Sequence, residues 1–306
     1  MLVLSSRRYP GPAWDDLRDV EYFDWPLRER RPGAEALAVV ARPVDAALLD
    51  LLPDLRVVAN YGAGHELVDV EACRTRGIVV TNTPGAVDAP TADLAFALML
   101  AVRRRIAEGD RYVRSGRWGS GWAEEELMGD DVSGATLGIV GLGGIGRAVA
   151  RRARAFEMRV LYSRRNRLPA EEERELGVEY RELDDLLAEA AVVTLHVPHT
   201  HETESLIDGR RLGLMADGAC LINTARGAVV DEEALVQELV SGRIRAGLDV
   251  FVHEPHVPDE LLGLPNVVLV PHLGTALASA REAMTRVLVD NLLAVERGET
   301  PPNVVT

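Results

Sequence analysis

Three side chains have the chemistry that reduction of a carbonyl group requires. His272 can donate a proton, because imidazole titrates near neutral pH. Glu254 can stabilise the charged form of that imidazole, and the planar guanidinium of Arg226 can bind a carboxylate or polarise a carbonyl. Each residue alone also has an ordinary structural explanation, as an ion pair or a loop side chain. Together they predict an acid–base pair with a substrate clamp, provided that the fold brings them together.

A glycine-rich turn predicts that a dinucleotide takes part in this chemistry. Gly141, Gly143 and Gly146 form the pattern G-x-G-x-x-G, directly after an apolar run and at the start of a predicted helix. In that context the first glycine permits a tight turn, the second lets the backbone approach a pyrophosphate, and the third lets the helix pack on the strand. The helix N-terminus then offers unpaired N–H groups to the phosphates.

The end of the next predicted strand, 159–162, indicates which dinucleotide is bound. An NAD site usually has an acidic residue about 20 residues after the glycines, where it binds the ribose 2′-hydroxyl. Here the sequence reads Ser163, Arg164, Arg165, Asn166 and Arg167, so three arginines cluster and no carboxylate is present. Because arginine can accommodate a 2′-phosphate, we expect NADP(H) to be preferred, with NAD(H) possible.

The elements that must position these residues alternate between strands and helices. The predicted strands are 37–41, 55–59, 78–80, 137–140, 159–162, 191–198, 219–223, 246–251 and 267–270. Such alternation predicts parallel sheets covered by helices, in which ligands bind at the carboxyl ends of the strands. Arg226, Glu254 and His272 follow three successive strands. We therefore expect them to meet at the edge that carries the glycine turn.

Composition narrows the class of protein. The chain has 306 residues, enough for two domains, and its net charge of −14 argues against a nucleic-acid-binding protein. It contains no lysine, which excludes Schiff-base chemistry and a Walker lysine. No apolar run is long enough for a membrane span, and no signal-peptide pattern is present. Cys73 and Cys220 lack a metal-like spacing, so we expect two buried thiols, a cytoplasmic protein and no metal site.

Taken together, these motifs resemble those of the D-isomer-specific 2-hydroxyacid dehydrogenase family, and within it most closely those of the glyoxylate/hydroxypyruvate reductases. The resemblance covers nearly the whole chain, and the order and spacing of its motifs are highly specific. The matching segments are 59–64, 80–84, 91–95, 138–146, 195–198, 223–227, 247–251, 254–255 and 271–274.

The resemblance implies an α/β fold of two Rossmann-like domains with parallel sheets and an active site in the cleft between them. The substrate-binding domain is then discontinuous, comprising residues 1–98 and 282–306, and the dinucleotide-binding domain comprises residues 99–281. A homodimer formed through the dinucleotide-binding domains is also implied. In some members a loop tryptophan reaches the partner's active site, and Trp118 and Trp122 fall in that loop.

The resemblance also implies roles for individual residues. His272 is the expected acid–base residue, Glu254 its partner, and Arg226 the residue that binds the 2-oxo acid. The backbone of Ala63 and Gly64 is expected to hold the substrate carboxylate, with His272 also in contact with the substrate. The expected cofactor contacts are Thr91, Gly141, Leu142, Gly143, Gly144, Ile145, Gly146, Ser163, Arg164, Arg165, His196, Pro198, Thr203, Thr224, Ala225, Asp249, His272 and Gly274.

We therefore expect an NADPH-preferring reductase that converts glyoxylate to glycolate and hydroxypyruvate to D-glycerate. Two alternatives stay open. One is a broader 2-ketoacid or 2-ketogluconate reductase with a larger pocket, and the other is a dinucleotide-sensing binding protein similar to the corepressors that resemble this family. The sequence departs from the family pattern at His199, where leucine is common, and the role of that residue is left open.

Overall fold

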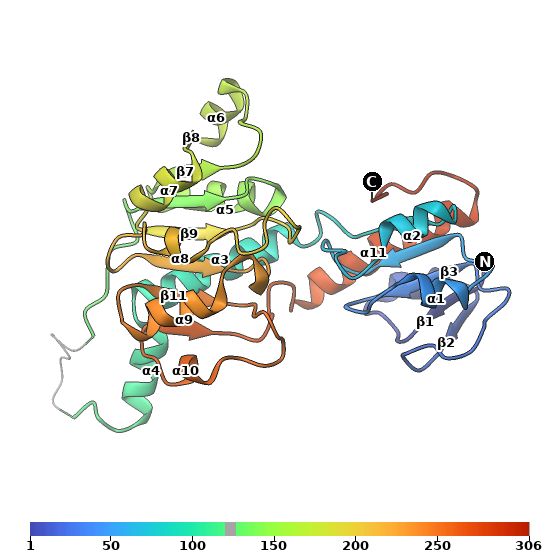
Figure 1. Ribbon diagram of the computed structural model, residues 1–306, viewed down its shortest axis with the longest axis horizontal. Coiled ribbons are helices and arrows are strands. Elements are labelled where there is room, and N and C mark those ends of the chain that lie inside the picture. The colour runs from blue at the N-terminus through green and yellow to red at the C-terminus, as the bar shows by residue number, and fades with distance from the viewer. Residues whose placement is uncertain (120–126, 306) are drawn as a thin grey trace. The chain divides into compact units, whose positions relative to one another are not determined.

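The structure is a computed structural model that describes residues 1–119 and 127–305 of the chain. The chain divides into two compact units, Met1–Asp88 with Thr275–Thr306 and Ala89–Gly274, and each contains one parallel β-sheet (Figure 1). These boundaries lie earlier in the chain than the predicted ones at 98/99 and 281/282. One reason is that the single helix α3 (Asp88–Arg103) packs its buried side chains into the core of the second unit.

The first unit has five parallel strands in the order β2-β1-β3-β4-β5. The strands are β1 (Val3–Ser5), β2 (Val20–Tyr22), β3 (Ala36–Val39), β4 (Val57–Asn60) and β5 (Val79–Thr81). Its helices are η1 (Pro12–Asp16), α1 (Ala46–Asp50), α2 (Val70–Thr75) and α11 (Ala278–Glu296). Strands β3 and β4 are buried at every position, which is typical of parallel strands covered on both faces.

The second unit has seven parallel strands in the order β12-β11-β10-β9-β6-β7-β8. They are β6 (Thr136–Val140), β7 (Arg159–Ser163), β8 (Val178–Tyr180), β9 (Val192–Leu195), β10 (Cys220–Asn223), β11 (Arg245–Leu248) and β12 (Val267–Leu269). The strand order reverses at β6, between β7 and β9, and such a switch point is where open α/β sheets bind ligands. The glycine turn follows β6.

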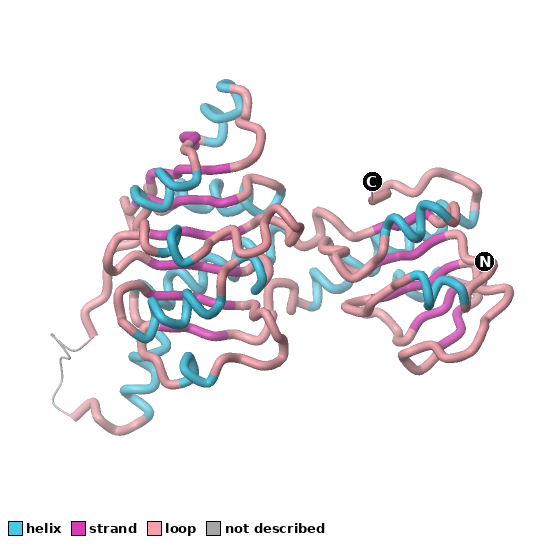
Figure 2. The backbone as a smooth tube through the Cα atoms, viewed as in Figure 1, coloured by secondary structure: helices cyan, strands magenta, loops and turns pink. Residues whose placement is uncertain are grey.

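Helices lie on both sides of this sheet (Figure 2). Besides α3 they are α4 (Ile106–Arg114), α5 (Gly144–Ala155), α6 (Ala170–Leu176), α7 (Leu183–Glu189), α8 (Gly209–Leu212), η2 (Gly227–Val229), α9 (Glu232–Val240) and α10 (Asp259–Leu262). Two hydrophobic clusters divide the buried strand residues, with Leu195 and Leu221 in one and Ile139 and Ile222 in the other. The fold class predicted from the sequence, two Rossmann-like units with parallel sheets, is confirmed.

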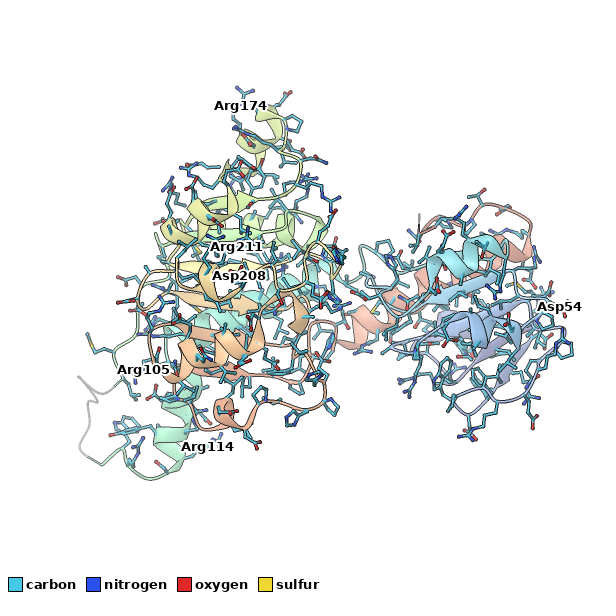
Figure 3. The ribbon with its side chains drawn as sticks, in the orientation of Figure 1. Asp54, Arg105, Arg114, Arg174, Asp208 and Arg211 are labelled. Carbon is cyan, nitrogen blue, oxygen red and sulfur yellow. The ribbon has the colours of Figure 1, made fainter. Side chains whose placement is uncertain are left out.

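Several helices begin at an aspartate whose side chain accepts a backbone N–H of the first turn, which stabilises the helix start. These caps are Asp45, Asp69, Asp208 and Asp231. Asp208, for example, accepts the N–H of Arg211 at 2.8 Å, and both residues are labelled in Figure 3. In the part of the chain that is described, no helix has the length and apolar character needed to cross a membrane.

Candidate active site

The three residues that the sequence predicts as an acid–base pair and a substrate clamp follow three neighbouring strands. Arg226 follows β10, Glu254 follows β11 and His272 follows β12. Because these strands are parallel and adjacent, their carboxyl ends lie at one edge of the sheet, the edge that also carries the glycine turn after β6. The sheet thus provides a common platform for residues that are up to 46 positions apart in the sequence, from 226 to 272.

His272 and Glu254 form a direct pair. Nδ1 of His272 lies 2.8 Å from Oε2 of Glu254, while Oε1 of the same carboxylate accepts the backbone N–H of Phe251 at 3.1 Å. The carboxylate is therefore fixed from two directions. The second ring nitrogen of His272, Nε2, makes no hydrogen bond to any described residue, and half of the side chain is exposed. This arrangement orients the ring and leaves Nε2 able to donate or accept a proton.

The backbone around His272 is held in an uncommon conformation. His272 has φ = +52°, a left-handed value rare for residues other than glycine. Its N–H donates to the carbonyl oxygen of Asp249 at 2.9 Å, and the Asp249 carboxylate accepts the N–H groups of Leu273 and Gly274. Burial raises the pKa of Asp249, which is 1% exposed, and these two backbone donors oppose that rise. Thr91 donates to the carbonyl oxygen of Gly274 at 3.3 Å. Asp249 and Thr91, predicted as cofactor contacts, thus shape the His272 loop.

The loop that carries Arg226 is fixed by a residue to which the sequence analysis gave no role. Oδ1 of Asn223 accepts the N–H of Ala225 at 3.0 Å, and its Nδ2 donates to the carbonyl oxygen of Arg226 at 2.9 Å. The next residue, Gly227, lies so close to Phe251 that a Cβ atom there would sit 2.1 Å from the Phe251 carbonyl carbon. Only glycine permits this approach, which packs the Arg226 loop against the loop that leads to Glu254. In the sequence, the only sign of this close approach was the glycine directly after Arg226.

The three glycines of the turn have different surroundings. Gly141 has φ = +93°, and a Cβ atom on Gly146 would lie 2.2 Å from the carbonyl oxygen of Gly141. A Cβ atom on Gly143 would meet nothing within 4 Å, although this residue is the N-cap of α5. Two glycines are therefore required by the fold, and the third leaves open space at a helix N-terminus. This space suits a phosphate group.

Among the described residues, three buried side-chain polar atoms in the segments that follow β9 and β10 have no hydrogen-bond partner, and the first of these residues, His196, lies beside Gly141. They are Nδ1 of His196, Nε2 of His199 and Oγ1 of Thr224. Burial lowers the pKa of His196 to about 3, so its ring is neutral, and its Nε2 lies 2.9 Å from Oγ1 of Thr194. Buried polar groups normally have partners, so these orphan atoms fit a polar ligand such as a dinucleotide. Pro198 and Thr203 stabilise the same loop, because Thr203 Oγ1 donates to the Pro198 carbonyl oxygen at 2.6 Å.

The arginines after β7 are not equivalent. Arg167 forms a two-point contact with the carboxylate of Glu173, at 2.8 and 2.9 Å. Arg165 pairs with Glu202. Arg164 is partly buried and makes no side-chain hydrogen bond or ion pair within residues 1–119 and 127–305. The three arginines, which are neighbours in the sequence, therefore differ in the structure. Arg167 is held in a buried network, Arg165 is in an exposed ion pair, and Arg164 is available for a ligand.

In the first unit, the loop after β4 presents two free backbone donors. Side-chain amides hold its carbonyl groups: Asn60 Nδ2 donates to the Gly64 oxygen at 2.7 Å, and Asn82 Nδ2 donates to the Ala63 oxygen at 2.8 Å. The N–H groups of Ala63 and Gly64 have no acceptor in the described structure. Adjacent free N–H groups suit a carboxylate. The loop was predicted from the sequence, whereas the two asparagines that hold it were not.

Comparison with known proteins relates this site to a family. The model of the D-isomer specific 2-hydroxyacid dehydrogenase NAD-binding domain matches residues 96–274. Glyoxylate reductase from Thermococcus kodakarensis is 48% identical over 308 residues, covering 99% of this chain and 92% of that protein. Glyoxylate reductase from Pyrococcus horikoshii is 50% identical, covering 88% of this chain and 81% of that protein.

Solved structures give the same relationship. A Thermus thermophilus protein, TT0316, has a TM-score of 0.91 and 45% identity, with all of both chains covered. The NADPH-dependent glyoxylate/hydroxypyruvate reductase of Sinorhizobium meliloti, solved in complex with NADP and malonate, has a TM-score of 0.89 and 32% identity. That match covers 100% of this chain and 97% of that one.

Proposed function

The chain belongs to the D-isomer-specific 2-hydroxyacid dehydrogenase family and is an NAD(P)-dependent oxidoreductase acting on CH–OH groups, and from this we propose that it reduces small 2-oxo acids, with NADPH preferred. The proposed reactions are glyoxylate to glycolate and hydroxypyruvate to D-glycerate. The observation that carries the proposal is the 2.8 Å contact between His272 and Glu254 at the sheet edge with the glycine turn. The names of the glyoxylate reductases with which the chain shares about half its residues support the choice of substrate.

In the proposed reaction His272 is the acid. Its imidazolium donates a proton from Nε2 to the substrate's carbonyl oxygen, because Nδ1 is occupied by Glu254. The carboxylate of Glu254 stabilises the positive ring before the transfer. Arg226 binds the 2-oxo acid and polarises its carbonyl. When bound, the reduced nicotinamide supplies a hydride to the carbonyl carbon, so the carbonyl gains one hydride and one proton and becomes an alcohol.

The second unit supplies the proposed cofactor site. The N–H groups at the start of α5, beside the open position at Gly143, would hold the pyrophosphate. The unpartnered atoms of His196 and Thr224 would accept or donate hydrogen bonds along the same edge. Ser163, Arg164 and Arg165 would surround the adenosine ribose, and a guanidinium there favours the 2′-phosphate of NADPH.

The first unit supplies the proposed carboxylate site. The free N–H groups of Ala63 and Gly64 would bind the substrate carboxylate, since Asn60 and Asn82 already hold the loop's carbonyl oxygens away from it. Backbone donors of this kind need no rearrangement when the anion arrives, which favours binding of a small acid. Because the net charge of −14 repels anions, local hydrogen-bond donors such as these have to attract the substrate carboxylate.

We also propose that the protein acts as a homodimer in the cytoplasm. None of the nine residues of α4 is buried in the chain, although α4 carries apolar side chains. Ile106, Val113, Trp118 and Met128 are exposed on α4 and its neighbouring segments. Burial of such side chains against a second copy would remove apolar surface from water. Trp122, the other tryptophan of the predicted loop, lies outside the described residues.

The test is turnover with defined substrates. Loss of reduced-nicotinamide absorbance is followed with NADPH or NADH against glyoxylate, hydroxypyruvate, pyruvate and 2-ketogluconate. Faster oxidation of NADPH with glyoxylate or hydroxypyruvate is expected. Activity only with NADH would overturn the cofactor preference, and activity only with 2-ketogluconate would overturn the substrate choice. Tight dinucleotide binding without turnover would favour a dinucleotide-sensing binding protein instead.

A further inference from the structure

We propose that Glu173 is a positioning residue for cofactor selection. From α6 it fixes the loop 163–168 and pairs with Arg167. Arg164 is then the arginine of this loop whose guanidinium binds the 2′-phosphate. The inference rests on the proposed preference for NADPH and adds the residues that produce it. Glu173 touches neither the substrate nor the cofactor in this proposal. It acts through the loop that carries Arg164.

One buried carboxylate joins both ends of that loop. Oε1 of Glu173 accepts the Tyr162 hydroxyl at 2.7 Å and Nε of Arg167 at 2.8 Å, and Oε2 accepts the second Arg167 nitrogen at 2.9 Å. The Tyr162 hydroxyl in turn accepts the N–H of Leu168 at 2.9 Å. Tyr162 is the last residue but one of β7, and Leu168 ends the loop. The segment from 163 to 167 is therefore closed at its base by side-chain hydrogen bonds.

The network has the properties of a rigid element. Glu173 is only 8% exposed, and its hydrogen bonds with Arg167 and Tyr162 lower its pKa to about 2. A carboxylate buried in this way is ionised at neutral pH and depends on its partners, so removal of one partner is costly. The Arg167 guanidinium also lies 5.4 Å from the centre of the Tyr180 ring, which restricts it further.

Helix α6 itself is attached to the glycine-turn helix. Glu172, beside Glu173, forms an ion pair with Arg147 near the start of α5. Arg174, which follows Glu173, is exposed and points away from the sheet (Figure 3). Two adjacent glutamates of α6 thus hold the loop 163–168 on one side and the first turns of α5 on the other. We infer that α6 fixes the distance between the pyrophosphate end and the 2′ end of the proposed site.

The pairing pattern decides which arginine is available. Arg167 pairs with Glu173 and Arg165 pairs with Glu202, whereas the Arg164 side chain has no hydrogen-bond or ion-pair partner among the described residues. The Arg165–Glu202 pair is exposed on both sides, and such pairs are weak. In the Arg167–Glu173 pair the carboxylate is buried and the contact is bidentate. Arg167 is therefore a fixed part of the scaffold, and the 2′-phosphate contact falls to Arg164, with Arg165 as the exchangeable neighbour.

The experiment measures the dissociation constants of NADPH and NADH directly, by titration, for the wild type, Glu173→Gln and Tyr162→Phe. Glu171→Gln is the matched control, because Glu171 is an exposed glutamate of the same helix. For Glu173→Gln we expect the NADPH constant to rise roughly fivefold or more while the NADH constant stays within about twofold. Tyr162→Phe keeps the Arg167–Glu173 pair and should give the same selective effect, but smaller. The control should leave both constants unchanged.

An equal rise for both dinucleotides, or no change in a folded variant, overturns the inference. If Glu173→Gln does not fold, Tyr162→Phe decides by the same comparison. Arg164→Ala separates this inference from the proposed function. If Arg164→Ala weakens NADPH selectively and the two network variants do not, the positioning role is wrong and the proposed NADPH site stands. If Arg164→Ala leaves the preference unchanged, the proposed NADPH site is wrong as well.

Discussion

Nδ1 of His272 lies 2.8 Å from Oε2 of Glu254, although 18 residues separate them in the chain. The pair exists because β11 and β12 are adjacent and parallel, and because Gly227 lets the Arg226 loop pack against the segment that precedes Glu254. It gives the ring one defined orientation. The predictions for His272 and Glu254 below follow from that orientation.

Replacement of His272 by alanine is expected to lower kcat by about 10² to 10⁴-fold, the usual contribution of a positioned acid–base group. The dissociation constant of the dinucleotide should change little, because the glycine turn and the residues after β7 are untouched. His256→Ala is the control, since His256 is exposed and forms no side-chain hydrogen bond within the described residues. Turnover within a few-fold of the wild type for His272→Ala would show that another group supplies the proton.

Glu254→Gln is expected to lower kcat by at least about tenfold while the KM for the 2-oxo acid stays similar. The amide can still accept the Phe251 N–H, so the loop keeps its shape, but it removes the negative charge beside the imidazolium. Steady-state kinetics with both constants resolved make the measurement. A rise in KM with unchanged kcat would place Glu254 in substrate binding instead of proton transfer.

Two alanine substitutions in the glycine turn should have opposite consequences. A Cβ atom on Gly146 would lie 2.2 Å from the Gly141 oxygen, so Gly146→Ala is expected to lower the midpoint of thermal unfolding by several degrees. Gly143→Ala meets no protein atom within 4 Å and should unfold at the wild-type temperature, yet bind dinucleotide roughly tenfold more weakly. Thermal unfolding and dinucleotide titration of both variants distinguish them. Unchanged dinucleotide affinity in Gly143→Ala would contradict the proposed pyrophosphate position.

Acid should weaken the Glu173 network in a defined range. Arg167 and Tyr162 lower the pKa of Glu173 from 4.5 to about 2, so its ionised form stabilises the fold fully above pH 4.5. That stabilisation is lost as the pH falls through the folded-state value. The difference in free energy of unfolding between wild type and Glu173→Gln should be about 1.5–3 kcal/mol at neutral pH and shrink below pH 4.5. Denaturant titrations across this range measure it, and a difference independent of pH would contradict the assigned pairing.

The sequence alone was sufficient for the features that depend on local pattern. Short apolar runs gave the strands of the central sheets, because a parallel strand is buried on both faces. The glycine turn was recognisable since its context, a strand followed by a helix, lies within a dozen residues. The positions of Arg226, Glu254 and His272 after successive strands predicted a common edge. The three-residue strands β1, β2 and β8 were missed, whereas β5 and β12, of the same length, were predicted. The missed strands each contain a polar residue and so do not stand out as apolar runs.

Only the tertiary structure decided the features that depend on partners distant in the chain. Asn82 reaches back 19 residues to hold the carbonyl of Ala63, and Glu202 lies 37 residues from Arg165. No local pattern encodes such pairs, so the sequence presents neighbouring arginines as one equivalent run. Their division into structural, paired and available side chains comes from the packing of α6 and the loop after β9. The sequence by itself therefore determined the family of chemistry at this sheet edge, and the tertiary structure decided which side chains remain available to perform it, because availability depends on the partners that folding brings near.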